Sequence, residues 1–327
     1  MATDQPTLDD TKRFRVKSET RPVLIAFGCI LLLLLVGSFY SRNFLSPEYL
    51  LQQLKVGSFL GIIATGMMVV ILLGQIDLSV PWSVTLGAMM GCAAAAYGPA
   101  GEAVAIPFGM LCGALMGVVN GIGVAYLRIP SMIMTLAVNA VAQGLMVAYT
   151  GGYAPQDAAP YAMRLLGADT SFGIVPNAVL AWAVVGVGAV GLLGRTTFGR
   201  AIFGIGNREA AAYLSGVRTQ RVVLAAFAMS GALSALGGLL LAGYAGKAAQ
   251  SMGDAYLLPA IAAVVLGGTS IAGGRGTYLG TVAGVILITL LQSILSVVQV
   301  PEAGRQVIYG VIIVGMLLLY GREKGHR

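Results

Sequence analysis

Long apolar stretches alternate with short polar segments along almost the whole chain. Ten stretches contain no Asp, Glu, Lys or Arg, namely 22–40, 56–73, 81–97, 104–127, 131–149, 174–194, 222–244, 255–271, 277–300 and 306–320. A helix needs about 20 apolar residues to cross the hydrocarbon core, and lipid admits only backbone whose polar groups are paired internally. The pattern predicts an all-α polytopic membrane protein with about ten transmembrane helices, with nine or eleven as alternatives because the eighth and tenth stretches are short.

Composition supports the same class. Hydrophobic residues make up 57% of the 327 residues and charged residues 10%, with a mean hydropathy of +0.85. This balance excludes a water-soluble globular protein. The stretch 22–40 is too long for a cleaved signal segment, so we expect it to be retained. The expected organisation is a tail 1–21, a transmembrane domain 22–320 and a tail 321–327.

The basic residues are unevenly distributed between the two sides that ten spans would define. With the N-terminus inside, 15 of the 20 Lys and Arg residues fall on inner segments and 5 on outer segments. This bias predicts that both termini are cytoplasmic. It also accounts for the net charge of +7 without a nucleic-acid partner.

Glycines recur every four residues in the fourth stretch, at Gly109, Gly113, Gly117 and Gly121. This spacing lets another helix approach closely, since helices in lipid associate through van der Waals contact. The groove predicts tight packing, either within the chain or as a dimer seam.

A few uncharged polar residues lie inside the apolar stretches, and one acidic residue lies close to them. Amides and hydroxyls in hydrocarbon are costly unless they are paired. The candidates to line a translocation path are Asp77, Ser79, Asn120, Thr135, Asn139 and Gln143. Hydrogen bonds between helices are the alternative role. Asp77 or Ser79 can equally cap the next helix, with Pro81 in its first turn, or belong to a break between two half-helices.

The chain offers no chemistry of its own. No predicted span holds an ionisable residue of the kind that couples ion movement to solute movement. Its three cysteines are separated within apolar stretches and its one histidine is His326, so we expect neither a metal site nor a nucleophile. A run from Gly267 to Thr277 is rich in glycine but lacks the order of a phosphate-binding loop. Its Gly267, Gly268, Gly273 and Gly274 are predicted to form a hinge or gate.

A polar island, residues 195–221, interrupts the apolar pattern and carries five arginines. Gly204 and Gly206 disfavour one long helix, so the island predicts two short helices with a turn near Gly206-Asn207. The second would run from Glu209 and stop at Ser215-Gly216. A short helix of this kind can lie in a groove on a partner protein.

Several motifs in register make the chain resemble a known family. The matching pieces are Gln75-Ile76-Asp77-Leu78-Ser79, Asn120-Gly121, Ile129-Pro130-Ser131, Thr135-Leu136, Thr150-Gly151-Gly152, Thr197-Phe198-Gly199-Arg200, Gly206-Asn207, Ala210-Ala211, Ser215-Gly216 and Leu266 to Thr277. In these the chain resembles the permease subunits of ABC importers of the ribose-type carbohydrate family, which also includes branched-chain amino-acid permeases. Pro81-Trp82 departs from the glycine-rich continuation that is common there.

The resemblance implies a type II ABC importer-like bundle in the inner membrane that is not itself an enzyme. Residues 199–216 would dock on a separate ATPase subunit, which would hold ATP and Mg, while this chain would bind no cofactor. The implied ATPase-coupling residues are Phe198, Gly199, Arg200, Gly204, Gly206, Asn207, Arg208, Glu209, Ala210, Ala211 and Gly216. A second permease subunit would pair with the chain, and an extracytoplasmic solute-binding protein would dock on 150–173, which includes Tyr153, Gln156, Asp157, Tyr161, Arg164 and Asp169.

The neutral polar residues favour a sugar of the monosaccharide class as the solute. Branched-chain amino acids or nucleosides are the alternative within the same class of importer. A passive channel or ion-coupled carrier, which needs no ATPase, is the alternative from another class, and a structural scaffold fits an amide-lined interior poorly.

Overall fold

Helices joined by short turns make up most of the structure, a computed structural model that describes residues 25–39, 42–153, 155, 157–171 and 173–322. The predicted tail 1–21 and residues 323–327 lie outside the described residues. The elements are a helix Ile25–Phe39, η1 (Arg42–Leu45), α2 (Pro47–Leu72), α3 (Val80–Ala95), α4 (Pro99–Ala125), α5 (Ser131–Tyr149), α6 (Tyr161–Gly167), β1 (Thr170–Ser171), β2 (Val175–Pro176), α7 (Asn177–Arg195), α8 (Thr197–Asn207), α9 (Glu209–Leu214), α10 (Thr219–Ala245), η2 (Asp254–Tyr256), α11 (Leu257–Leu266), α12 (Tyr278–Val297) and α13 (Glu302–Arg322).

Each of the ten apolar stretches coincides with a helix. Within the described residues, six helices are long and apolar enough to cross a membrane: α2, α4, α5, α7, α10 and α12. The mainly helical, polytopic architecture is confirmed at this level. The eighth stretch, 255–271, forms only the 10-residue helix α11 after η2. At 1.5 Å per residue α11 is about 15 Å long, half the hydrocarbon thickness. It ends there because the chain turns at Gly267 and at Gly268, whose φ is +87°.

Several helices begin before the apolar stretch that predicts them, which places charged residues inside them. The clearest case is Lys55, which the pattern assigns to an outer segment. It lies within α2, its side chain is 9% exposed, and its ammonium donates to the carbonyl of Ala168. The ammonium also lies 5.3 Å from the centre of the Tyr244 ring. The expectation that no span holds an ionisable residue is therefore wrong for α2, because the carbonyl and the ring offset the cost of burying this cation.

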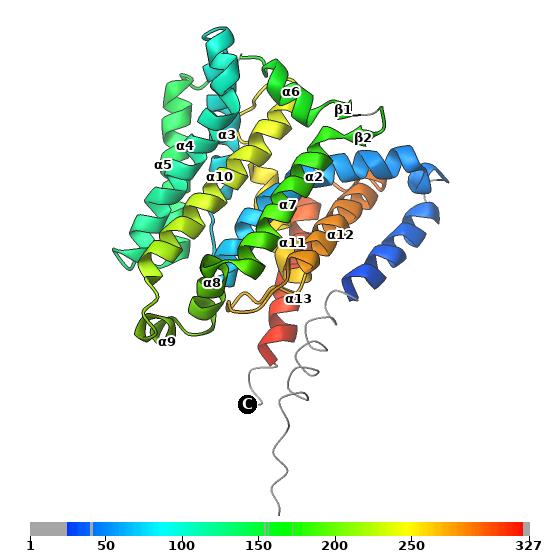
Figure 1. Ribbon diagram of the computed structural model, residues 1–327. Helices are drawn as coiled ribbons and strands as arrows, with labels where there is room; N and C mark the ends of the chain where they lie inside the picture. Colours follow the sequence, from blue (N-terminus) through cyan, green and yellow to red (C-terminus); the bar gives the residue numbers. More distant parts are fainter. Residues whose placement is uncertain (1–24, 40–41, 154, 156, 172, 323–327) are drawn as a thin grey trace, which may run out of the picture.

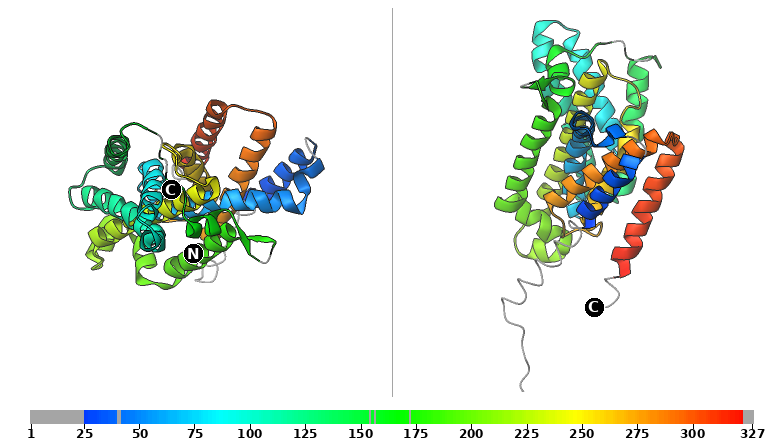
Figure 2. Two further views of the ribbon diagram at one scale, coloured as in Figure 1. Left: turned by 90° about the horizontal axis from the view of Figure 1, so that it is seen from above. Right: turned by 90° about the vertical axis from the view of Figure 1, so that its right-hand side faces the viewer.

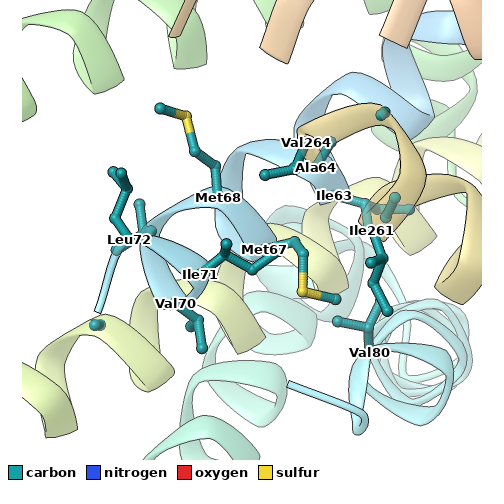
Figure 3. Packing of buried hydrophobic residues seen from close by; sticks show 14 of the residues in the cluster. Ile63, Ala64, Met67, Met68, Val70, Ile71, Leu72, Val80, Ile261 and Val264 are labelled. Atoms are coloured by element: carbon teal, nitrogen blue, oxygen red, sulfur yellow. The ribbon is translucent and has the colours of Figure 1, made fainter. Parts of the chain in front are cut away.

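The core is built around α2. Most of this helix is buried, and its Met67 and Ile71 lie in one cluster with Val80 at the start of α3 and Ile261 of α11 (Figure 3). On the other side of the bundle, the glycine groove of α4 faces α10. A Cβ added at Gly113 would lie 2.4 Å from the Gly231 carbonyl oxygen, and one at Gly117 would lie 2.1 Å from that of Phe227. Of the two roles predicted for the groove, the structure shows packing within the chain, since α10 occupies the groove.

The bundle has two distinct ends. The turn between α3 and α4 lies at one end with α6, and α8 and α9 lie at the other (Figure 1). The views in Figure 2 place the helix Ile25–Phe39 on the side opposite α4, with α12 beside it. This arrangement separates the candidate coupling element from the candidate outer surface.

Candidate functional site

The first part of the site is the non-helical segment 73–79 between α2 and α3. Its Asp77 is fully buried. One carboxylate oxygen accepts the backbone N–H of Ser79 at 3.0 Å and its hydroxyl at 2.6 Å, and the other accepts the Ser230 hydroxyl of α10 at 2.8 Å. Asn120 of α4 donates to the Ser79 hydroxyl oxygen at 2.7 Å. The carboxylate therefore organises the break in the helix through hydroxyls from two elements.

Polar side chains of α5 accept hydrogen bonds from the backbone of the same region. Ser131 Oγ accepts the N–H of Ile76 at 3.3 Å, and Thr135 Oγ1 accepts that of Leu78 at 3.0 Å. Asn139 Oδ1 accepts the N–H of Trp82 at 3.3 Å. In a helix or sheet, backbone carbonyls would accept these N–H groups. Here the side chains accept them instead, because buried N–H groups require partners. We call Ser131, Thr135 and Asn139 the α5 ladder.

The structure brings together five of the six predicted path residues. Asp77, Ser79, Asn120, Thr135 and Asn139 share one hydrogen-bonded region, whereas Gln143 is exposed on α5. Sequence reasoning missed Ser131, although its position four residues before Thr135 was a usable signal. Ser79 occupies the N-cap position of α3 without a side-chain cap bond, and Pro81 lies in the first turn as expected. Segment 73–79 is therefore both a break after α2 and the start of α3. The first turn of α3 leaves backbone N–H groups without partners inside the helix, and Asn139 pairs the one of Trp82.

The polar island folds as two short helices, α8 and α9, separated at Arg208. The predicted turn near Gly206-Asn207 is confirmed to within a residue, although both Gly204 and Gly206 lie inside α8. After α9, Gly216 has a φ of +83°, a left-handed conformation that glycine adopts without strain. The island therefore has the local structure that its sequence favours.

Close backbone contacts join α8 to the rest of the bundle. A Cβ on Gly206 would lie 1.9 Å from the carbonyl oxygen of Leu72 and 2.5 Å from the nitrogen of Gly274. One on Gly273 would lie 2.7 Å from the nitrogen of Gly74, and the Gly274 N–H donates to Leu72 O at 2.9 Å. We call Gly74, Gly206, Gly273 and Gly274 the glycine joint. It ties the coupling element, the end of α2 and the predicted hinge loop together through main-chain atoms.

The other two predicted hinge glycines, Gly267 and Gly268, lie in the same loop but outside the glycine joint. A Cβ on Gly267 would lie 2.3 Å from the carbonyl oxygen of Gly280, so that this position lets α11 and α12 approach closely. Gly268 provides the left-handed turn that ends α11. The four glycines therefore shape one loop, and two of them contact the coupling element.

The outward face of the coupling element is exposed and mixed in chemistry. Tyr213 and Leu214 of α9 are 68% and 85% exposed. The exposed cations of the island are Arg195, Arg200, Arg208, Arg218 and Arg221. Glu209 accepts from Arg128 in the α4–α5 turn at 2.9 Å. This ion pair links α9 to the start of α5, so the island reaches the bundle at two places.

Of the remaining implied coupling residues, some face the bundle and some face away. Gly199 is buried, and its Cβ would lie 2.3 Å from the Leu193 carbonyl oxygen. Phe198 is half-buried, whereas Arg200, Asn207, Ala210 and Ala211 are exposed. The element thus combines an inner surface that packs on the bundle with an outer surface that a partner could contact.

Comparison with known proteins identifies the family. Residues 49–317 match the family model described as "Branched-chain amino acid transport system / permease component". The chain belongs to this permease family. It is 33% identical over 302 residues to the autoinducer 2 import system permease protein LsrC of Yersinia pseudotuberculosis serotype O:1b (strain IP 31758), which covers 91% of this chain and 84% of that protein. The LsrC protein of Yersinia pestis (strain Pestoides F) gives the same identity and coverage.

No solved structure matches the chain. The family and the apolar helices establish a multi-pass membrane permease component of the inner membrane.

At the end of the permease opposite α9, the described residues of segment 150–173 are held against the bundle. α6 packs closely on α10, since a Cβ on Gly243 would lie 1.9 Å from the Met163 carbonyl oxygen. Asn177 donates to Leu165 O at 2.7 Å, and Gln250 to Thr150 Oγ1 at 2.8 Å. Among the predicted docking residues, Tyr153, Tyr161, Arg164 and Asp169 are exposed, Asp157 is half-buried, and Gln156 lies outside the described residues.

Proposed function

We propose that the chain is the transmembrane subunit of an ATP-driven ABC importer that carries a solute of the monosaccharide class into the cell. ATP hydrolysis belongs to a separate ATPase subunit, which holds ATP and Mg, and this chain contributes no catalytic residue. A second permease subunit completes the path, and an extracytoplasmic binding protein delivers the solute to the face formed by segment 150–173. We also propose ten membrane helices or half-helices, with both termini in the cytoplasm.

One observation carries this proposal: an exposed pair of helices is fixed to the bundle by main-chain contact. The exposed arginines and the apolar Tyr213 and Leu214 suit a groove with acidic edges on a partner protein. The glycine joint leaves no flexible side chain between α8 and the end of α2. Force applied to the island would therefore reach the core helix with little loss.

The mechanism follows the covalent and packed connections away from the island. From the glycine joint, the chain passes directly from the end of α2 into the segment 73–79. From Glu209, the ion pair reaches Arg128, three residues before α5. Movement of the island would thus act on both sides of the α5 ladder. Closure of the partner's nucleotide sites would rock the bundle between inward and outward access.

The solute class is argued from the polar groups near the break. Ser79 donates to the Asp77 carboxylate and accepts from Asn120, while Thr135 and Asn139 accept N–H groups of the backbone beside it. Three donors already satisfy Asp77. Such a lining suits hydroxyl groups better than a zwitterion, which calls for a free charge of each sign. The curated relatives are permeases of autoinducer 2 import systems, so autoinducer 2 belongs in the test panel with ribose, other pentoses and hexoses, and leucine.

The docking role is tested by a charged residue at the tip of α9. Leu214→Asp places a carboxylate where an apolar side chain is 85% exposed. We expect it to reduce co-purification of the ATPase subunit and solute-stimulated ATP hydrolysis at least about tenfold, the effect of a lost interface hot spot. The matched control is Tyr97→Asp, since Tyr97 is 86% exposed at the opposite end and should leave both unchanged. Equal losses for the two variants would contradict docking through α9.

The importer class is tested in proteoliposomes. Uptake against a gradient should require ATP, the ATPase subunit and the binding protein together. Uphill accumulation by the chain alone, driven by an ion gradient, would assign it to the ion-coupled carriers, and downhill flux alone would assign it to the channels.

A further inference from the structure

A fourth side chain that can accept hydrogen bonds, Gln143, continues the spacing of the α5 ladder. Ser131, Thr135 and Asn139 are spaced by four residues, and Gln143 continues the series at the same interval. The first three accept the N–H groups of Ile76, Leu78 and Trp82, whereas Gln143 is exposed. The helix thus carries four acceptor side chains in series for three donors.

A screw movement converts this series into a second register. Four residues of an α-helix correspond to about 6 Å along the axis and about 40° around it. If α5 moved by that amount toward its own N-terminus, each acceptor would take the place of the one before it. Thr135 would then face Ile76, Asn139 would face Leu78 and Gln143 would face Trp82. All three N–H groups would keep a partner.

The opposite movement would not preserve the pairing. α5 begins at Ser131, so a shift of four residues toward the C-terminus would leave no residue of the helix at the position of Ser131, and the Ile76 N–H would lose its acceptor. An unpaired buried N–H is costly, so the ladder permits one direction and opposes the other. The position of the fourth acceptor therefore gives the helix a preferred direction.

The packing of α5 is consistent with such a movement. Only 22% of its apolar window is buried, compared with 89% for α2. The Thr135 hydroxyl donates to the carbonyl oxygen of Ser131 in the same helix at 2.8 Å. This hydrogen bond is kept when α5 moves as a rigid body, and the Thr135 oxygen can still accept from a new partner. Arg128, close before α5, is held by Glu209 of the coupling element. The least enclosed of the candidate spans is thus tied directly to the element that receives the force.

We propose that α5 alternates between two registers during transport, and that Gln143 is the positioning residue that replaces Asn139 at the Trp82 amide in the second. This rests on the proposed function, because the energy for the movement would come through α8 and α9. Gln143 acts through the backbone of α3 and need not touch the solute. The proposal gives the exposed Gln143 side chain a hydrogen-bond partner, the Trp82 N–H, in the second register.

The functional test replaces the fourth acceptor. Gln143→Leu removes it while changing nothing that is bonded in this structure, so we expect unchanged insertion and stability but uptake reduced about two- to tenfold, the effect of one net hydrogen bond. Gln143→Thr, which restores a hydroxyl acceptor of the type used at Thr135, should recover uptake. The control Val141→Leu alters an exposed residue of α5 outside the series and should transport as the unaltered chain does.

The register itself can be read by disulfide cross-linking, in a background with Cys29, Cys92 and Cys112 replaced by Ala. A Cβ on Gly123 of α4 would lie 2.4 Å from Met134 Sδ, and in the second register Val138 would take that place. Gly123→Cys with Met134→Cys should cross-link at rest. Gly123→Cys with Met134→Ala and Val138→Cys should cross-link only during ATP turnover with the partner subunits present.

The outcomes separate the two proposals. Uptake by the unaltered chain is measured first in the same vesicles, and its absence would count against the importer. Normal uptake by Gln143→Leu, or no cross-link at position 138 in vesicles that transport, would overturn the second register. Loss of permease dimer in Gln143→Leu would also overturn it, because Gln143 would then belong to a contact between subunits.

Discussion

At the scale of single residues, Asp77 shows how a carboxyl group can be buried in an apolar protein. The side chain is fully buried and receives three hydrogen bonds, two from Ser79 and one from Ser230. Removing this acceptor would leave buried donors without partners, which is costly. Asp77 therefore holds segment 73–79 against α10.

Replacing this acceptor should destabilise the fold. We expect Asp77→Ala to lower the free energy of unfolding by about 3 kcal/mol, measured by titration with denaturing detergent in mixed micelles. Asp77→Asn keeps one acceptor oxygen for Ser79 and offers an amide to the Ser230 oxygen, so its loss should be about 1 kcal/mol. An Asp77→Ala variant as stable as the unaltered chain would show that the carboxylate is not a structural centre.

At this scale the sequence predicted the polar side chains of the network better than it predicted their partners. Asp77, Ser79, Asn120, Thr135 and Asn139 were identifiable because polar groups are rare in apolar stretches. Thr135 and Asn139 accept the backbone N–H groups of Leu78 and Trp82, and a backbone donor leaves no trace in residue type. A hydrogen bond to main chain depends on where the helix breaks, and composition does not fix that position.

At the scale of elements, the two short helices of the island were predictable, and the short eighth stretch allowed a partial span without showing where α11 ends. Local signals define α8 and α9, since the glycines, the alanine run and the left-handed Gly216 lie within the segment itself. The end of α11 depends on tertiary contact, because Gly267 and Gly280 meet across two helices. An apolar run of 17 residues looks like a span until such a contact is known.

The glycine joint gives a prediction for the coupling element. Gly206→Ala would place a methyl group 1.9 Å from Leu72 O, which the backbone can accommodate only by separating α8 from α2. We expect insertion to be retained and solute-stimulated ATP hydrolysis to fall at least about tenfold, as overpacking at a close contact displaces the whole element.

The control for this variant is Gly194→Ala in α7. A Cβ at Gly194 meets nothing within 4 Å, and alanine favours a helix more than glycine does. Stimulated hydrolysis should stay at the level of the unaltered chain. If Gly206→Ala behaves in the same way, the joint does not transmit force.

At the scale of the whole molecule, hydropathy predicted the helical membrane class and the positions of the helices, while the number that cross remains a prediction. Six described helices satisfy the length and composition of a span. α3 and α11 are shorter because each begins or ends at a break inside the bundle. Charge distribution alone supports cytoplasmic termini, since no contact within one chain reports which side is which.

Orientation can be measured by thiol labelling in the same cysteine-free background. Tyr97→Cys and Leu214→Cys place single thiols on opposite ends, at residues 86% and 85% exposed. A membrane-impermeant maleimide added to intact cells with a permeable outer envelope should label position 97 only. Both positions should react after the inner membrane is opened, and labelling of position 214 in intact cells would reverse the proposed topology.

The glycine joint bears on how such permeases can diversify. Its contacts are made by main-chain carbonyl and amide groups, and they are close because Gly206, Gly273 and Gly274 carry no Cβ. Substitutions at Ser79, Asn120, Thr135 or Asn139 would change side chains near the solute and keep the four glycines of the joint, so the preferred solute could change during evolution while the subunit keeps the same ATPase partner.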